Sequence, residues 1–318
     1  MQFTIDRPQH DGLSSIRMSD NVSGTSVSIL PDHGALLHEF IILRNKEPYN
    51  IIENYSNYEA LTKELHLSYR GAKLSPFACR IMNACYQFDG KTYTFDNKFY
   101  DGSAIHGLLA DKKFEIIEQF VNERNACIRL SYEYSGEDAG YPFPYTCTVT
   151  YNLLAGNLLK VSTEITNNGN QTIPIADGWH PYFRLMGNVD ELELCFQSGK
   201  QVEFNESLVP TGHFVDDQRF LAPALLKDIA LDNCFLLPDQ RNEEPVCILS
   251  NPSKNLRLEV YADCGYSYLQ IYTPKDRASI AIENLSAAPD CFNNSLGVLK
   301  LNPQSSTTFA LRYKIITG

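Results

Sequence analysis

The sequence lacks long apolar runs and basic clusters, and both absences exclude classes of function. No window approaches the roughly 18 uncharged apolar residues that a membrane-spanning helix needs. The 318 residues carry a net charge of −11, and no run of Lys and Arg is long enough to follow a nucleic-acid backbone. The N-terminus shows no basic segment followed by an apolar one, so we expect no secretory signal. We therefore expect a cytoplasmic protein without membrane or nucleic-acid partners.

Motifs for metal, phosphate and serine-nucleophile chemistry are also missing. The nine cysteines are scattered without CxxC or CxxH spacing, which predicts free thiols and neither disulfides nor structural zinc. The chain has no His-x-His, no His-Glu-x-x-His, no calcium-binding loop, no Gly-x-Ser-x-Gly and no phosphate-binding glycine loop. No alternation of strands and helices suggests a dinucleotide-binding fold. We expect neither a metal nor a cofactor.

What the chain does contain is period-2 alternation of apolar and polar residues. It is clearest in residues 126–134, 146–151, 159–166, 256–260 and 309–315. One apolar face and one polar face is typical of strands in antiparallel sheets. The pattern predicts an all-β fold, a large antiparallel β-sandwich with two extended sheets packed face to face.

Turn residues agree with this prediction. Asp89-Gly90 lies between two alternating segments and predicts a hairpin, and Asn168-Gly169 looks similar. Only residues 56–65 favour a helix, with Ser56 in a capping position. No linker composition divides the chain, so we expect a single domain over residues 1–318.

The only tryptophan lies in Gly178–Phe183, where His180 is surrounded by large aromatic residues. Aromatic rings stack on the apolar face of a sugar, and histidine titrates near neutral pH. The segment therefore suggests proton transfer on a carbohydrate. The alternative is a buried aromatic cluster around a hydrogen-bonded histidine.

Two carboxylates are candidate catalytic groups. Glu283 closes a short apolar strand, residues 280–283, and precedes a polar loop. Partial desolvation would raise its pKa from about 4.3 toward that of a general base. The alternative is a strand-end glutamate in solvent. Asp232 has apolar neighbours on both sides and is either functional or a turn-capping aspartate.

Two further residues belong to the candidate set. His106 precedes Gly107, and a glycine there permits close approach by a ligand. Arg80 is flanked by apolar residues, so its guanidinium requires an anion or several acceptors. Those acceptors belong either to a ligand or to a structural ion pair.

Several segments, taken in order, resemble the aldose 1-epimerase (galactose mutarotase) family. They are Ser75–Ile81, Phe88–Tyr93, Ile105–Gly107, Gly178–Phe183, Val209–Gly212, Leu231–Phe235, Ala281–Glu283 and Ala288–Asn293. The resemblance covers the chain from Tyr69 to Asn294. It implies a galactose mutarotase-like supersandwich with an open, concave sugar-binding cleft, and an isomerase that needs no cofactor or metal.

The resemblance also implies a role for each candidate. Glu283 would be the general base that takes the proton of the anomeric hydroxyl. His180 would be the general acid that protonates the ring oxygen, which opens a free hexose to its aldehyde. Rotation about the C1–C2 bond and reclosure would give the other anomer. His106, Arg80 and Asp232 would bind the substrate.

The sequence departs from the family pattern at two positions. Cys79 stands where the family usually has asparagine, which removes an amide able to bind a sugar hydroxyl. Trp179 stands where many members have a small polar residue, which indicates a different subgroup. The substrate is expected to be a small sugar, and the protein a monomer or homodimer.

Three other functions stay open from the sequence. A hexose-6-phosphate 1-epimerase would need cations at the far end of the sugar, for which Arg70, Lys73 and Arg184 are candidates. A non-catalytic carbohydrate-binding protein would not require both an acid and a base. A glycoside hydrolase would use Asp232 and Glu283 as its carboxylate pair.

Overall fold

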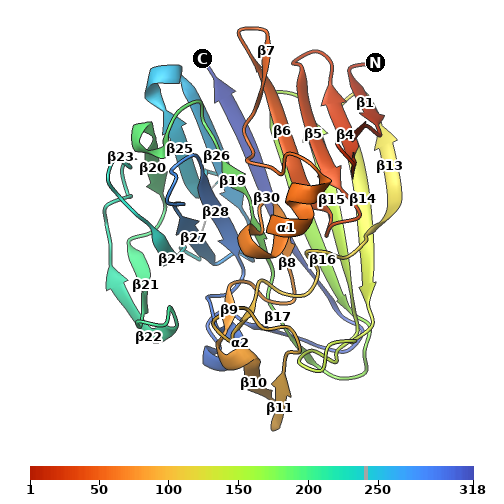
Figure 1. Ribbon diagram of the computed structural model, residues 1–318, viewed down its shortest axis with the longest axis vertical. Coiled ribbons are helices and arrows are strands. Elements are labelled where there is room, and N and C mark those ends of the chain that lie inside the picture. Colours follow the sequence, from red (N-terminus) through yellow and green to blue (C-terminus); the bar gives the residue numbers. More distant parts are fainter. Residues whose placement is uncertain (240–242) are drawn as a thin grey trace.

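The computed structural model describes residues 1–239 and 243–318, and it is built almost entirely of antiparallel strands (Figure 1). In this part of the chain the strands form sheets of nine, eight and five strands and four two-stranded ribbons. Helices are short there: α1 (Tyr58–Ser68), α2 (Cys291–Asn294) and the 3₁₀ turns η1 (Met82–Ala84), η2 (Val189–Glu191) and η3 (Pro252–Lys254). The predicted all-β antiparallel fold is confirmed.

The nine-stranded sheet forms the long back of the described molecule. In spatial order its strands are β13 (Glu115–Val121), β14 (Asn125–Tyr134), β15 (Tyr145–Leu154), β16 (Leu158–Asn167), β30 (Ser306–Thr317), β26 (Leu256–Ala262), β25 (Cys247–Asn251), β20 (Glu193–Phe196) and β23 (Ala224–Leu225). Its strands include every segment for which strict alternation predicted a strand. These predictions succeed because apolar side chains on alternate positions bury one face of each strand.

Two further sheets cover this long sheet. The eight-stranded sheet consists of β22 (Pro210–Asp216), β21 (Lys200–Phe204), β24 (Asp232–Leu236), β27 (Tyr268–Tyr272), β28 (Ile280–Leu285), β18 (Gly178–His180) and β8 (Ala72–Leu74), with β19 (Tyr182–Phe183) also paired to β28. The five-stranded sheet consists of β1 (Phe3–Asp6), β4 (Ile16–Asp20), β5 (Thr25–Leu30), β6 (Leu36–Arg44) and β7 (Glu47–Asn50). The ribbons are β2 (Gln9–His10) with β3 (Leu13–Ser14), β9 (Arg80–Ile81) with β12 (Ala104–Ile105), β10 (Cys85–Phe88) with β11 (Lys91–Thr94), and β17 (Ile173–Ile175) with β29 (Leu299–Leu301).

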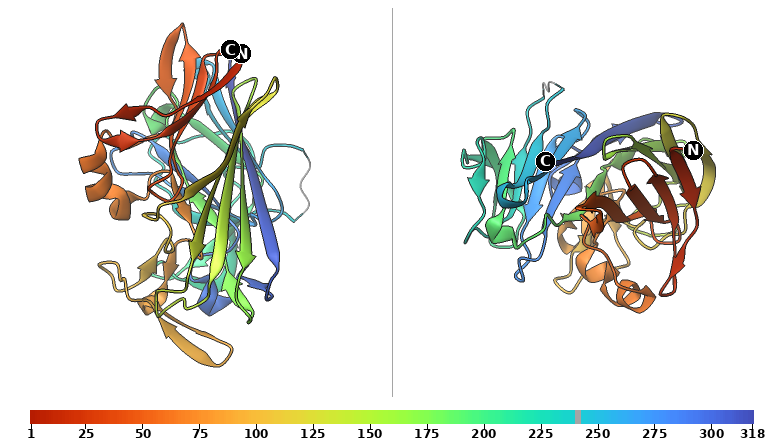
Figure 2. Two further views of the ribbon diagram at one scale, coloured as in Figure 1. Left: turned by 90° about the vertical axis from the view of Figure 1, so that its right-hand side faces the viewer. Right: turned by 90° about the horizontal axis from the view of Figure 1, so that it is seen from above.

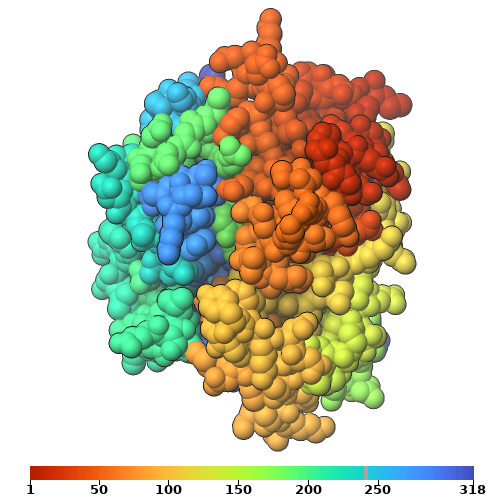
Figure 3. Space-filling view, in the orientation of Figure 1, coloured from red at the N-terminus to blue at the C-terminus, as the bar shows by residue number. Residues whose placement is uncertain are grey.

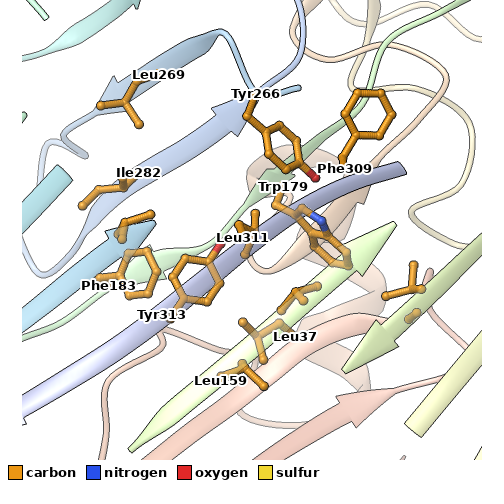
Figure 4. Packing of buried hydrophobic residues seen from close by; sticks show 14 of the residues in the cluster. Leu37, Leu159, Trp179, Phe183, Tyr266, Leu269, Ile282, Phe309, Leu311 and Tyr313 are labelled. Atoms are coloured by element: carbon orange, nitrogen blue, oxygen red, sulfur yellow. The ribbon is translucent and has the colours of Figure 1, made fainter. Parts of the chain in front are cut away.

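The arrangement is a sandwich with one divided layer. Strands β1 and β4 contact β13, β14 and β15, so the five-stranded sheet lies over that half of the long sheet (Figure 2). Over the other half, Leu269 and Ile282 of the eight-stranded sheet share a core with Leu311 and Tyr313 of β30 (Figure 4). Face-to-face packing was predicted correctly, but the layer opposite the long sheet is split in two. The alternation of apolar and polar residues indicates which face of a strand is buried, but it does not indicate which sheet the strand joins.

Turn predictions had mixed outcomes. Asp89 and Gly90 have φ of 48° and 73°, as a tight two-residue hairpin requires, and they join β10 to β11. The second hairpin prediction was wrong. Asn168-Gly169 follows β16, but β16 pairs with β15 and β30 and not with the strand that comes next in the chain. The side-chain amide of Gln304 donates to the carbonyls of Asn168 and Gly169. The helix exists, but Asn57 caps it by accepting from the Ala60 amide at 2.8 Å, in place of Ser56.

The cysteines follow the sequence prediction. All nine are free thiols, and six of them are buried. A buried free cysteine behaves as a small apolar side chain, so these residues contribute to packing. Within the described residues no helix has the length and apolar character to cross a membrane.

Candidate active site in a cleft of the eight-stranded sheet

Strand β28 divides its side chains between the core and a cleft. Ile280 and Ile282 lie in the apolar core, whereas Glu283, one residue further on, lines the cleft. Gln270 of β27 stands directly opposite Glu283 in the strand register and faces the same cleft. The sequence placed Glu283 at a strand end, and this was wrong: β28 continues to Leu285, and Glu283 is only 2% exposed.

All five predicted site residues line this one cleft. Its volume is about 490 Å³, which is typical of small-molecule sites. The predicted residues among its lining are Arg80, His106, His180, Asp232 and Glu283. Figure 3 shows the face on which their segments meet, with orange residues near 70, amber residues near 100 and blue residues near 275 around the cleft.

A buried histidine and a buried carboxylate are in contact at the base of the cleft. The Nε2 atom of His180 lies 3.5 Å from Oε1 of Glu283, and both side chains are buried. The other carboxylate oxygen, Oε2, is buried and has no hydrogen-bond partner among the described residues. Tyr182 holds the imidazole by parallel stacking, with ring centroids 4.9 Å apart and planes 10° apart. A buried oxygen without a partner, on a residue that lines a cleft, can be satisfied by a bound ligand.

Burial controls the protonation of this pair. Desolvation raises the pKa of the Glu283 carboxyl well above its ordinary value, and the nearby charge of Asp232 raises it further. Desolvation also lowers the pKa of the His180 imidazole to about 3. Both shifts favour the neutral forms, a protonated Glu283 carboxyl beside an uncharged His180 imidazole.

His106 is held in a fixed orientation beside the pair. Its Nδ1 accepts a hydrogen bond from the Cys79 amide at 3.3 Å, so in the neutral ring Nε2 carries the proton. Its ring lies against His180, at 4.9 Å and 74°, and against Tyr69, at 4.6 Å. Burial lowers the pKa of His106 well below its ordinary value, and the neighbouring His180 and Arg80 lower it further. His106 is therefore a neutral hydrogen-bond donor.

Gly107 is needed for a reason other than the one expected. Its φ is 80°, and a Cβ at this position would lie 2.2 Å from the carbonyl oxygen of Ser75. The amide of Leu108 donates to this same carbonyl at 2.8 Å. The close approach that glycine permits is therefore made by the chain itself and not by a ligand. It fixes the backbone that carries His106.

The remaining two candidates have partners within the protein. Arg80 donates from Nε to Asp101 at 3.0 Å, so the structural ion pair exists while the guanidinium still borders the cleft. Asp232 is the first residue of β24 and lines the cleft, so it does not cap a turn. It accepts a hydrogen bond from the side-chain amide of Gln270 at 2.8 Å. The Oε1 atom of Gln270 is buried without a partner among the described residues.

The same geometry bears on metal binding. Ligand atoms of His106, His180 and Glu283 lie within 4.8 Å of one another, which is close enough to hold an ion. Metal-bound histidines usually donate their second ring nitrogen to an acceptor. Here the Nδ1 of His106 accepts from a backbone amide, which places the proton on the nitrogen that a metal would need. The donor set therefore fits a metal poorly.

Comparison with known proteins identifies the family. A model of the aldose 1-epimerase family matches residues 14–314. The chain belongs to this family. The resemblance that the sequence motifs showed between Tyr69 and Asn294 is confirmed and extends beyond both ends.

Individual relatives agree with this assignment. The Escherichia coli K12 protein YihR, described as uncharacterized, is 28% identical over 246 residues, which cover 75% of this chain and 77% of YihR. A galactose mutarotase-like protein from Clostridium acetobutylicum superposes with a TM-score of 0.87 at 17% identity, covering 100% of this chain and 99% of that one. Galactose 1-epimerase from Lactobacillus acidophilus gives 0.81 at 18% identity, covering 99% of both chains. The structural matches show a galactose mutarotase-like fold.

Two residues that depart from the family's motifs have different surroundings. Trp179 is buried in the core (Figure 4), with its ring 4.7 Å from the Lys73 ammonium and 5.8 Å from the Tyr151 ring. It does not line the cleft, so it supports His180 from behind and stacks on no ligand there. Cys79 does line the cleft, and burial raises the pKa of its thiol well above the ordinary value, so it is a neutral thiol.

Sequence reasoning missed several residues of the cleft. Gln270, Tyr272, Tyr69 and Glu53 line it, together with Tyr182 from the aromatic hexapeptide. The spacing of Tyr182 two residues after His180 was a usable signal, because alternate residues of an extended chain share a face. Gln270 and Tyr272 have the same spacing, but only the strand register shows that they lie beside Glu283.

Proposed function

We propose that this protein is an aldose 1-epimerase that interconverts the α and β anomers of a free hexose. The observation that carries the proposal is the contact between His180 Nε2 and Glu283 Oε1 at the base of the cleft. Ring opening of a hemiacetal requires removal of the anomeric proton and protonation of the ring oxygen. A buried acid–base pair supplies both transfers, and positioned acid–base catalysis contributes roughly 10²–10⁴-fold.

The residues act in sequence on the bound sugar. In the active form Glu283 is the carboxylate that accepts the anomeric proton, and His180 is the imidazolium that protonates the ring oxygen. This form differs from the neutral pair only by transfer of one proton from the Glu283 carboxyl to His180. His106 donates from Nε2 to a sugar oxygen, while Arg80 and Asp232 bind ring hydroxyls. After rotation about C1–C2, the reverse transfers close the other anomer.

The charges around the cleft favour an uncharged sugar over a sugar phosphate. Lys73 was proposed as a phosphate ligand, but it is fully buried and paired with Asp177. Arg70 lines the cleft but has ion pairs with Glu53 at 3.7 Å and Glu64 at 2.9 Å. Arg184 is not among the lining residues. Besides the neutral Glu283, the lining includes three acidic residues and two arginines, a balance that would repel a phosphate dianion.

The other two candidate functions have less support. A glycosidase would need Asp232 and Glu283 to flank one bond, yet strand β27 separates their strands and Gln270 lies between them. The group in contact with Glu283 is His180. A protein that only binds sugars has no use for a buried pair with opposite pKa shifts, because such groups are costly to bury.

We further propose that neither a metal nor a cofactor takes part, because the reaction transfers only protons and His106 presents an N–H to the cleft. The free thiols also suit a reducing, cytoplasmic setting.

Polarimetry tests the proposal. Freshly dissolved α-glucose and α-galactose should equilibrate faster with the protein than in buffer, and pretreatment with EDTA should leave the rate unchanged. Glucose 6-phosphate, measured by an anomer-specific NMR assay, should be a poorer substrate than glucose. The absence of any acceleration for both free hexoses would refute the proposal, and a preference for the phosphate would refute the charge argument.

A further inference from the structure

The imidazole of His180 lacks the support that orients many catalytic histidines. In such sites the second ring nitrogen donates to a carboxylate or a carbonyl, which fixes the tautomer and the orientation of the ring. The Nδ1 atom of His180 is buried and has no hydrogen-bond partner in another described residue. The backbone carbonyl of His180 itself raises the pKa of the ring, but burial outweighs this effect and lowers the pKa to about 3.

Two neighbouring rings pack against this imidazole. Tyr182 lies parallel to it, with ring centroids 4.9 Å apart and planes 10° apart, so the face of the phenol covers the face of the imidazole. His106 meets it at the same centroid distance but at 74°. A cation within about 6 Å of an aromatic centroid, over the ring face, is attracted by that ring. Tyr182 therefore has the geometry to favour a charged His180.

The backbone holds the two stacked rings in place. Alternate residues of an extended chain share a face, which brings the side chains of His180 and Tyr182 together. The Gly71 amide donates to the His180 carbonyl at 2.9 Å, and the Glu53 amide donates to the Tyr182 carbonyl at 2.9 Å. Tyr182 is only 5% exposed, and Tyr272 meets its ring at 87°. The phenol is thus fixed before any charge forms on His180, as preorganised stabilisation requires.

We propose that Tyr182 is a positioning residue for the acid–base pair: its ring holds the His180 imidazole beside Glu283 and stabilises the imidazolium that ring opening requires. This inference rests on the proposed epimerase function. The active form arises when one proton moves from the Glu283 carboxyl to His180, whose atoms are 3.5 Å apart. The face of the phenol attracts the charged imidazole more strongly than the neutral one, so it stabilises the active form of the pair relative to the neutral form.

The size of the effect follows from the contact. A cation–π contact changes an equilibrium by about 2- to 30-fold, depending on how far it is desolvated. Removal of the ring should lower the fraction of the pair in the active form, and hence kcat, by this factor. Because the role of Tyr182 is exerted on the imidazole and not on the sugar, KM should change less than kcat.

The test is polarimetry of α-glucose mutarotation at pH 7, with kcat and KM determined separately at equal concentrations of folded protein. Tyr182→Leu removes the ring and should lower kcat by about 2- to 30-fold. Tyr182→Met is a second variant without a ring, since methionine fills irregular core space, and should show a similar loss. Tyr182→Phe keeps an aromatic face and should retain kcat within about 2-fold of the wild type.

A matched control separates this role from general damage. Tyr261 of β26 has the Arg312 guanidinium 4.5 Å from its ring centroid but does not line the cleft, so Tyr261→Leu should change neither kcat nor KM. An unchanged kcat in the folded variants without a ring would overturn the positioning role and leave the epimerase proposal standing.

Two other results would also overturn the positioning role. An equal loss of kcat in Tyr182→Phe would show that the hydroxyl, and not the ring, is responsible. A rise in KM at constant kcat would show that Tyr182 acts by binding the sugar. Absence of acceleration by the wild type would instead refute the epimerase proposal itself.

Discussion

The buried ion pair behind His180 gives the most quantitative prediction. Lys73 and Asp177 are both 0% exposed, with Nζ 2.5 Å from Oδ2. The same ammonium donates to the Gly178 carbonyl at 2.9 Å, and Tyr266 donates to the other Asp177 oxygen at 2.8 Å. These contacts connect β8, β18 and the segment before β27. They therefore fix the strand that ends at His180.

Lys73→Met keeps most of the side-chain volume but leaves the Asp177 carboxylate buried without its cation. Breaking a buried pair in this way costs about 3–5 kcal/mol. At about 2 °C per kcal/mol for a chain of this size, the Tm should fall by roughly 6–10 °C. Burial raises the pKa of Asp177 even beside Lys73. Without Lys73 the folded carboxyl binds its proton more readily than the unfolded one, so the variant loses more stability as the pH rises.

The assay is thermal unfolding at pH 5.5 and pH 8, together with kcat and KM, for the wild type, Lys73→Met and the double variant Lys73→Met with Asp177→Asn. The double variant removes the unpaired charge and should be more stable than Lys73→Met at pH 8, with a smaller difference at pH 5.5. Displacement of His180 should lower kcat more than it raises KM. A double variant no more stable than Lys73→Met at pH 8 would show that lost packing, and not the uncompensated charge, causes the damage.

Three other predictions follow from the cleft. Glu283→Gln should raise the Tm at pH 8 but not near pH 4.5, because the raised pKa makes the wild type lose stability as the pH rises; equal melts at pH 8 would contradict this. Asp232→Asn should move the alkaline limb of the kcat/KM–pH profile to lower pH, because the pair needs the proton that Glu283 holds and the Asp232 charge helps to raise the pKa of Glu283. Gly107→Ala should destabilise the protein more than Gly102→Ala in denaturant melts: both glycines have φ near 80°, but only Gly107 would meet the Ser75 backbone.

Local patterns in the sequence predicted much of the fold. Alternation located the strands of the long sheet because it records the burial of one face, a property of consecutive residues. The hairpin at Asp89-Gly90 was predictable for a similar reason: the turn depends on two adjacent residues with positive φ. The division of the opposite layer into two sheets was not predictable, because strand pairing joins residues far apart in the chain.

The site shows the same limit. Motif order made Glu283 and His180 candidates, yet nothing local to either residue reveals that their side chains are in contact. Lys73 illustrates this limit: the sequence offered it as one of three candidate cations for a sugar phosphate, and only the structure shows that it pairs with Asp177. Pairing of charges is a long-range property, so sequence reasoning supplied the candidates and the structure supplied their partners.

One measurement tests the acid–base assignment most directly. It is the initial rate of α-glucose or α-galactose mutarotation, followed by polarimetry at pH 7 for wild type, Glu283→Gln and His180→Asn at equal concentrations of folded protein. We expect acceleration by the wild type and a loss of at least about 10²-fold in each variant. Acceleration by either variant at the wild-type rate would contradict the assignment of the pair as the catalytic acid and base.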